Sequence, residues 1–316
     1  MSRQQLRIVV WCLVIGVPIA AFAVWAITEN ARQFFSTFLN GVTLAALYFL
    51  VASGFTLVFG LMRNVNLAHG SLYLLGAYVG WVVGDKTDSW LLAVAAGFLT
   101  GAVIGLVLQL GVFRFMQGQD LRQTLVTIGL SIVLADIMLW MFGGEIYQFD
   151  PPRAIYGSLP LPIVRGYPLY RIVVLLTAVV IGVLLWGFLN RTRVGMMIRA
   201  GVDDRAMLAA SGVNVQRVFA ITFAIGAGMA GFAGVVGGTA LSISPGEDTR
   251  YLLASLLVVI IGGMGSITGA AIGALLIGLG EQFGLAYAPT YGVVFTFVIM
   301  ALVLAFRPRG IMGRPA

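Results

Sequence analysis

Residues 250–286 read RYLLASLLVVIIGGMGSITGAAIGALLIGLGEQFGLA, an apolar run that is interrupted by glycines at 262–266. A membrane helix needs about 20 mostly apolar residues to cross a hydrocarbon core of about 30 Å. The run is long enough for two helices, and its centre suits a tight turn because glycine reaches positive φ without steric cost. We therefore predict two helices joined by a turn or hinge at Gly262, Gly263 and Gly265.

The composition of the whole chain agrees with a membrane protein. Of its 316 residues, 60% are hydrophobic and 10% are charged, whereas soluble domains carry about 45–50% apolar and about 25% charged residues. A soluble enzyme, a disordered protein and a disulfide-stapled secreted domain are therefore disfavoured. One cysteine and one histidine cannot build a Cys/His zinc site, so no metal site is expected. The sequence predicts an all-α polytopic membrane protein.

Similar apolar runs lie on either side of 250–286 and predict about ten membrane helices, within a range of eight to ten. The first run is about 20 residues long, which favours a retained helix over a cleaved signal, whose apolar core usually has 7–15 residues. The whole chain, 1–316, is expected to form one transmembrane domain. The further runs lie at about 8–28, 36–60, 70–84, 90–112, 123–142, 169–189, 217–240 and 291–306.

The positions of the basic residues predict the orientation of these helices. With ten spans both termini lie on one side, and 13 of the 19 Lys and Arg residues belong to that side. Loops rich in Lys and Arg remain in the cytoplasm, so both termini are expected there. The net charge of +7 is then a topology signal. Nucleic-acid binding would need a basic cluster on a soluble face and is not expected.

Two glycine-rich runs, 36–60 and 217–240, are each followed by another glycine-interrupted helix. Paired interrupted helices in corresponding halves are typical of the internal repeats of transporters. With ten spans the two halves would run in opposite directions, which indicates an inverted repeat. Small residues at four-residue spacing also predict close helix crossings; in 217–240 they are Gly226, Ala230, Gly234 and Gly238.

Polar residues inside the apolar runs mark a candidate translocation path. An acid at mid-membrane costs about 2.5–3.5 kcal/mol, so Asp136 is expected to face protein or a water-filled cavity, and Glu281 to face the path or to bond a neighbouring helix. Non-helical backbone at membrane depth survives only where it is buried in protein or lines a cavity. The polar run after 36–60 therefore adds candidates, although capping of the next helix by Asn66 or Ser71 is an alternative. These candidates are Asn64, Asn66, His69 and Ser71.

The cytoplasmic loop at about 190–217 is predicted to carry a short helix of two to three turns. Two aspartates suit its N-terminus, and Gly212 suits its C-terminal stop. Apolar residues among mixed charges on such a helix indicate a surface for a partner protein, the alternative being a solvated loop. The candidate docking residues are Arg199, Asp203, Asp204, Arg205, Met207 and Leu208.

The sequence contains no motif of catalysis. It has no Gly-x-x-x-x-Gly-Lys-Ser/Thr loop, so no nucleotide or other cofactor is expected on this chain, and energy from ATP must enter through another subunit. A stand-alone secondary carrier is the alternative from another class, but it would need coupling-ion ligands, and only Asp136 and Glu281 lie within the spans. An intramembrane enzyme would need a nucleophile–base pair or a metal cluster, and neither is visible.

Three blocks of sequence carry a resemblance to a known family. They are Asn40-Gly41-Val42 through Gly60-Leu61 to Asn66-Leu67-Ala68-His69-Gly70 and Gly76-Ala77-Tyr78; Gly195-Met196 through Arg199-Ala200 and Gly212-Val213-Asn214 to Gly226; and Ile261–Ser266 with Gly269-Ala270 and the terminal PRGIMGRP of 308–315. Together they resemble the membrane permease subunits of bacterial ABC importers in the branched-chain amino acid family, which also serves urea and short amides. The family-like core is about 36–306. Two departures are Thr268, where the family often has proline, and the extra helix at about 8–28.

The resemblance implies an assembly in the cell inner membrane. It would contain this chain, a second permease or a copy of itself, two cytoplasmic ATPases that use ATP, and a solute-binding protein on the outer side. The helix at 200–212 would couple the ATPases to the permease. A branched-chain amino acid is the expected substrate, and urea or a short amide is the alternative.

Overall fold

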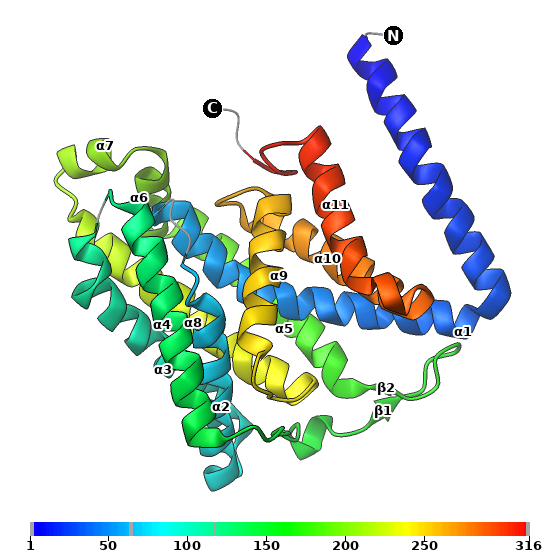
Figure 1. Ribbon diagram of the computed structural model, residues 1–316, viewed down its shortest axis with the longest axis horizontal. Coiled ribbons are helices and arrows are strands. Elements are labelled where there is room, and N and C mark those ends of the chain that lie inside the picture. Colours follow the sequence, from blue (N-terminus) through cyan, green and yellow to red (C-terminus); the bar gives the residue numbers. More distant parts are fainter. Residues whose placement is uncertain (1–2, 63–65, 117, 314–316) are drawn as a thin grey trace.

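The computed structural model describes residues 3–62, 66–116 and 118–313, and it is built almost wholly from helices (Figure 1). The short strands β1 (Ser158–Leu159) and β2 (Tyr167–Pro168) form an antiparallel hairpin in the connection between α4 and α5. The helices are α1 (Arg3–Met62), α2 (His69–Thr87), α3 (Trp90–Gly111), η1 (Phe113–Phe115), α4 (Asp120–Phe142), η2 (Arg153–Ile155), α5 (Leu169–Arg191), α6 (Arg193–Asp203), α7 (Arg205–Ala210), α8 (Val215–Ala240), α9 (Glu247–Gly262), α10 (Ile267–Tyr287), η3 (Pro289–Tyr291) and α11 (Gly292–Phe306).

Helix α1 joins two of the predicted spans in one element of 60 residues that is broken at Asn30, where φ is −155° and ψ is 88°. The Asn30 side chain accepts a hydrogen bond from the Gln33 backbone N–H at 3.0 Å, so it caps the second arm as an N-terminal asparagine does. The first arm projects away from the bundle (Figure 1). Phe22 packs on Tyr287 of α10, with 5.1 Å between ring centroids, which anchors that arm near the break.

Six helical segments within the described ranges are long and apolar enough to cross a membrane, and one of them, Ala20–Gly60, runs across the break in α1. An all-α polytopic architecture is therefore confirmed, while the count of about ten spans stays a prediction. The shorter helices fall between or beside these six, and α9 has 16 residues. The six segments are Ala20–Gly60, Trp90–Phe115, Asp120–Phe142, Leu169–Arg191, Val215–Ala240 and Ile267–Tyr287.

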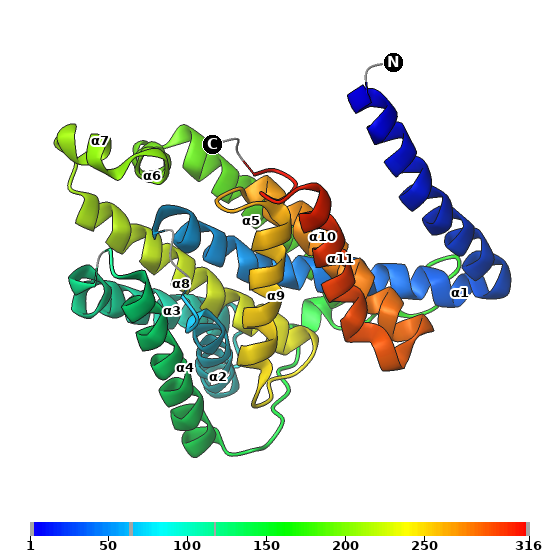
Figure 2. The same ribbon diagram turned by 45° about the horizontal axis from the view of Figure 1, so that its top comes forward.

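Helix α8 forms the centre of the core and is buried along most of its length. It crosses α1 and α3 with backbone against backbone: a Cβ on Gly54 would overlap the carbonyl oxygen of Gly226, and a Cβ on Gly231 would overlap that of Gly97. Such small residues let helices approach closely where burial alone does not drive them together. The predicted close crossings of 217–240 are therefore confirmed. Figure 2 shows α6 and α7 together at one end of the bundle, from which α8 leads back into it.

Candidate functional site

The segment predicted as a cytoplasmic loop folds into two short helices, α6 and α7. Helix α7 begins at Arg205, because the Asp204 carboxylate accepts hydrogen bonds from the backbone N–H groups of Ala206 and Met207 at 2.8 and 3.0 Å. It ends before Gly212, whose φ is +81°, so the predicted short helix is confirmed but has only six residues. Helix α6 was not predicted, because a short amphipathic helix with two glycines reads as a loop in the sequence.

A small separate core fastens α6 and α7 to the bundle. Ile198 of α6 is buried against Val218 and Phe219 of α8. The Arg205 guanidinium lies over the Phe219 ring, 4.9 Å from its centroid, which is within the range of a cation–π contact. Gly195 allows the turn from α5 into α6, since a Cβ there would overlap the Phe188 carbonyl oxygen. The two helices therefore form a fixed platform on α5 and α8.

The structure separates the predicted docking residues by the direction in which they face. Met207 is 68% exposed, whereas Leu208 is 5% exposed and anchors α7. Arg199 is half-buried and donates a hydrogen bond from Nη1 to the Asn190 side chain at 2.7 Å, so it faces the bundle. Asp203 is the last residue of α6, and its side chain lies outside the described part. Only Met207 of the two apolar candidates is thus available to a partner.

Three of the predicted path residues, Asn66, His69 and Ser71, are buried where α1, α2 and α4 meet. The Nε2 atom of His69 lies 3.1 Å from the Val51 carbonyl oxygen, and the Ser71 hydroxyl lies 2.9 Å from that of Ser131. Asn66 accepts a hydrogen bond from the Ala68 backbone N–H at 3.1 Å and so braces the turn before α2. Ser71 is not a cap, because it lies within α2. Asn64 lies outside the described residues.

Asp136 lies apart from these residues. Its side chain is exposed on the outer face of α4, whose buried residues are Gln123, Thr127 and Met138. The same outer face contains Gly129, which has open space around it. A carboxylate inside the hydrocarbon region does not face lipid without a large cost, so the exposed face of α4 that carries Asp136 is a candidate contact surface.

A polar cluster that the sequence did not reveal joins α1, α9 and α10. The Tyr48 hydroxyl donates to the Glu281 carboxylate at 2.6 Å, and Arg250 forms an ion pair with the same carboxylate at 3.2 Å. Glu247 lies 3.6 Å from Arg250 and completes the cluster. The interpretation of Glu281 as a bond between helices is therefore confirmed. Neither Tyr48 nor Arg250 could be assigned from spacing, because the three residues belong to different helices.

The glycine turn between α9 and α10 is held by the C-terminal segment. Gly263 and Gly265 have φ values of +100° and +78°, as the predicted turn requires. The backbone N–H groups of Ile311 and Met312 donate to the carbonyl oxygens of Ile261 and Gly262 at 2.8 and 2.9 Å. Ser266 then caps α10 by accepting from the Gly269 N–H at 3.0 Å. The turn is confirmed, and the C-terminal segment packs against it, so it is not an exposed loop.

Comparisons with known proteins find relatives that match most of the chain. The family described as "Branched-chain amino acid transport system / permease component" matches residues 37–304. The high-affinity branched-chain amino acid transport system permease protein BraD of Pseudomonas aeruginosa is 33% identical over 87% of this chain and 94% of its own length. The corresponding permease protein LivH of Escherichia coli K12 is 33% identical over 91% of this chain and 98% of its own length.

A more distant relative extends the comparison beyond amino acids. The ribose import permease protein RbsC of Escherichia coli K12 is 28% identical over 81% of this chain and 79% of its own length. No solved structure matches the chain at a significant level. The family match alone spans most of the bundle, from the second arm of α1 into α11. The chain therefore belongs to the family of permease components of branched-chain amino acid transport systems.

Proposed function

We propose that this chain forms the membrane path of an ATP-driven importer for branched-chain amino acids. The observation that carries the substrate class is the 33% identity to BraD and LivH over nearly their full lengths. The buried core is mostly apolar with few polar side chains, and a path through it would suit a small aliphatic zwitterion. Urea or a short amide is the alternative substrate, and measuring the uptake of both substrate classes distinguishes it from a branched-chain amino acid.

The assembly we propose contains a second permease, two ATPases and a solute-binding protein in the cell inner membrane. ATP belongs to the ATPases, and the α6–α7 platform is the element that receives them. Its exposed Met207 enters the ATPase, while Leu208 holds α7 in place. Both termini and the platform lie in the cytoplasm, since most of the basic residues belong to that side. The binding protein docks at the opposite end, where the β1–β2 hairpin lies.

Movement of the platform passes directly into the core. Only four residues separate α7 from α8, and the Asn214 side chain caps α8 by accepting from the Arg217 N–H at 3.1 Å. Helix α8 packs on α1, α2 and α3 through glycine contacts. A tilt of α7 would therefore tilt the central helix and the helices packed on it as one body.

The packing also supports an inverted repeat with α1 and α8 as corresponding helices. Helix α3 packs along α8, and α10 packs along the second arm of α1. Helices α1 and α8 cross each other at Gly54 and Gly226. Each long glycine-rich helix is thus covered by the helix that lies two elements beyond the other one, α8 by α3 and α1 by α10. Two such halves rocking about a shared crossing would alternate access.

The second permease covers the outer face of α4, so that Asp136 lies at the path between the two subunits. This explains an exposed acid at mid-membrane without a partner within the described part of the chain. The buried residues Asn66, His69 and Ser71 then hold α2 against α1 and α4 and do not line the path themselves.

A pull-down of tagged full-length protein from native membranes in mild detergent, followed by mass spectrometry, tests the assembly. We expect an ATPase with a phosphate-binding loop and a second permease. Uptake of labelled leucine and labelled urea into vesicles then separates the two substrate classes, with ATP omitted as the control. Recovery of the chain alone, with solute uptake that does not need ATP, would overturn the importer and favour a secondary carrier.

A further inference from the structure

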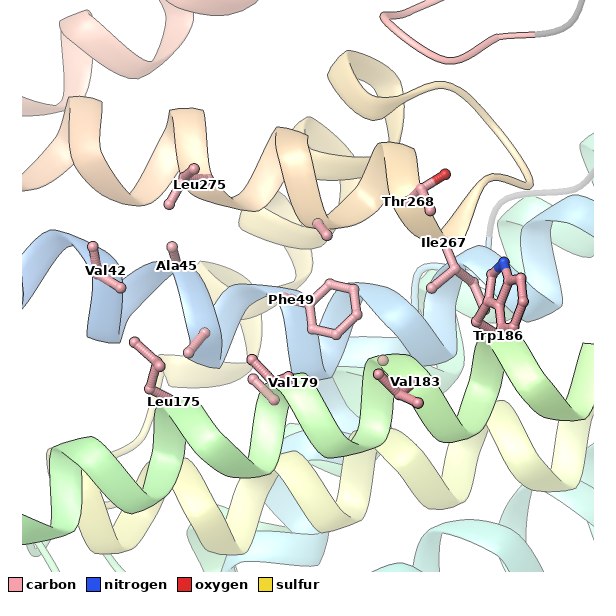
Figure 3. Close-up of a pocket in the computed structure, with 14 residues that line it drawn as sticks. Val42, Ala45, Phe49, Leu175, Val179, Val183, Trp186, Ile267, Thr268 and Leu275 are labelled. Atoms are coloured by element: carbon pink, nitrogen blue, oxygen red, sulfur yellow. The ribbon is translucent and has the colours of Figure 1, made fainter.

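An apolar cleft lies between the second arm of α1, α5 and α10 (Figure 3). Its volume is about 390 Å³, and Thr268 is the one residue with a hydroxyl among those that line it. Figure 3 shows side chains of all three helices facing this space, with Phe49 at its centre and Trp186 at one end. The labelled lining residues include Val42, Phe49, Val179, Val183 and Leu275.

A smaller polar cavity adjoins the Trp186 end of this cleft. Its volume is about 190 Å³, and it shares Trp186, Ile267 and Thr268 with the apolar cleft. Polar side chains of α5, α6, the turn before α10 and the first turn of α10 line it: Asn190, Arg199, Ser266 and Thr268. The two cavities together form one elongated site that is apolar along its length and polar at one end.

Arg199 lines the polar cavity and contacts none of the described carboxylates. Its Nη1 donates to Asn190 at 2.7 Å, but its buried Nε has no partner among the described residues. A guanidinium presents donors in a fixed fork that matches a phosphate. A buried donor without a partner is costly unless a ligand satisfies it.

The length of the cleft matches one leaflet of a bilayer. The α5 residues that line it extend from Leu175 to Trp186, which at about 1.5 Å per residue is about 16 Å. That is roughly half of a hydrocarbon core of about 30 Å. Trp186 then stands at the level where tryptophans gather between hydrocarbon and headgroups. The polar cavity beyond it lies at headgroup level, on the side of the bundle that carries α6 and α7.

We propose that this site binds an anionic glycerophospholipid, with one acyl chain in the cleft and the phosphate at Arg199. The hydroxyls of Ser266 and Thr268 and the amide of Asn190 bind the remaining phosphate and glycerol oxygens. The bound lipid fills the groove between α5 and α10 and touches both the base of α6 and the glycine turn. Arg199 is in this assignment a lipid ligand rather than a contact for an ATPase.

Native mass spectrometry of the tagged full-length protein, purified with its bound partners, tests this site. The detergent solution is supplied with phosphatidylglycerol and phosphatidylcholine of identical acyl chains, and the ratio of the two lipids retained per permease is measured. We expect a clear preference for phosphatidylglycerol. Arg199→Gln should lower that preference about ten-fold, as the loss of one charge-assisted contact to phosphate does. The exposed Arg193→Gln on the same helix is the matched control and should change nothing.

A second set of variants tests the cleft. Ala271→Phe and Val183→Phe each place a ring in the acyl-chain space and should lower retention of both lipids, whereas Ala95→Phe on the outer face of α3 should not. Inorganic phosphate should not displace the retained lipids, because it cannot fill the acyl-chain space. Equal retention of both lipids by the unaltered protein, or equal effects of Arg199→Gln and Arg193→Gln, would overturn the proposal. Loss of the second permease, and not of lipid, from the Ala271→Phe and Val183→Phe proteins would show that a protein helix fills the cleft.

Discussion

Met207 and Leu208 are consecutive residues of α7, yet the first is 68% exposed and the second is 5% exposed. Leu208 holds the helix on the bundle, and Met207 points away from it. The Asp204 carboxylate fixes the start of α7 and so fixes which of the two residues faces out. One short helix therefore combines an anchor and a contact surface.

This division predicts different defects at the two positions. Met207→Glu should lower ATP-dependent uptake and recovery of the ATPase in a pull-down while leaving the amount of permease in the membrane unchanged, because a charge enters an apolar contact without touching the core. Met207→Leu, which keeps an apolar side chain at the same position, is the matched control. Leu208→Ala should instead lower the stability of the permease by about 2–5 kcal/mol, as other large-to-small core changes do. Normal uptake by Met207→Glu would remove α7 from the coupling surface.

The close crossing of α3 and α8 predicts that one methyl group at its centre is harmful. Gly231→Ala should lower the thermal midpoint in detergent, because its Cβ overlaps the Gly97 carbonyl oxygen and overpacking costs about 1–3 kcal/mol. Gly187→Ala on α5 should raise the midpoint slightly, since its Cβ meets open space and alanine favours a helix by about 0.5–1 kcal/mol. Equal shifts for both variants would contradict the crossing.

The Tyr48–Glu281–Arg250 cluster predicts coupling between α1 and α10. Tyr48→Phe removes a hydrogen bond to a charged acceptor, for which the expected loss is about 1.5–3 kcal/mol in the free energy of unfolding. Glu281→Gln keeps an acceptor for the hydroxyl but loses the ion pair with Arg250 and should have a smaller effect, because Arg250 is partly exposed and exposed ion pairs contribute little. A double-mutant cycle in detergent micelles measures the coupling. If the effects of the two substitutions on the free energy of unfolding simply add in the double variant, the contact does not contribute to stability.

The contact between the glycine turn and the C-terminal segment predicts that alanine destabilises the protein unequally at two glycines with positive φ. Gly263→Ala places a Cβ 2.5 Å from the Gly313 nitrogen and should displace the C-terminal segment in addition to straining the turn. Gly212→Ala meets open space and should cost only the strain, about 1–2 kcal/mol. Thermal midpoints and proteolysis of the C-terminus report the two effects separately. Rapid C-terminal cleavage is expected in the first variant alone.

The exposed position of Asp136 predicts a transport defect without a folding defect. Asp136→Asn should leave the thermal midpoint of the purified chain unchanged, because no contact within the described residues is lost, and should lower ATP-dependent uptake. Ile132→Leu, one helical turn earlier on the same face, serves as the control. Normal uptake with a lowered midpoint would show that the acid supports the fold and does not face the path.

Much of the fold follows from hydrophobic runs alone. The limits of α3, α4, α5, α8 and α11 lie within a few residues of the predicted runs, because a membrane helix must satisfy its own backbone and only apolar side chains are tolerated around it. The glycine turn after Gly262 and the short helix before Gly212 were also readable, since caps and positive φ act over a few neighbouring residues. The two arms of α1 were also predicted as separate helices, and the backbone is indeed non-helical between them, at Asn30.

Contacts between distant residues were decided by the tertiary structure. The sequence marked Asp136, Asn66, His69 and Ser71 as polar residues at membrane depth, but only packing placed three of them in a buried junction and the fourth on an outer face. Packing likewise turned Arg199 toward the glycine turn and brought Tyr48 to Glu281 across 233 positions of chain. Local propensity and hydropathy act along the chain and so determine the helices. The direction in which a side chain points and the residues that it contacts depend on which helices cross. Those crossings depend on contacts between residues far apart in the sequence.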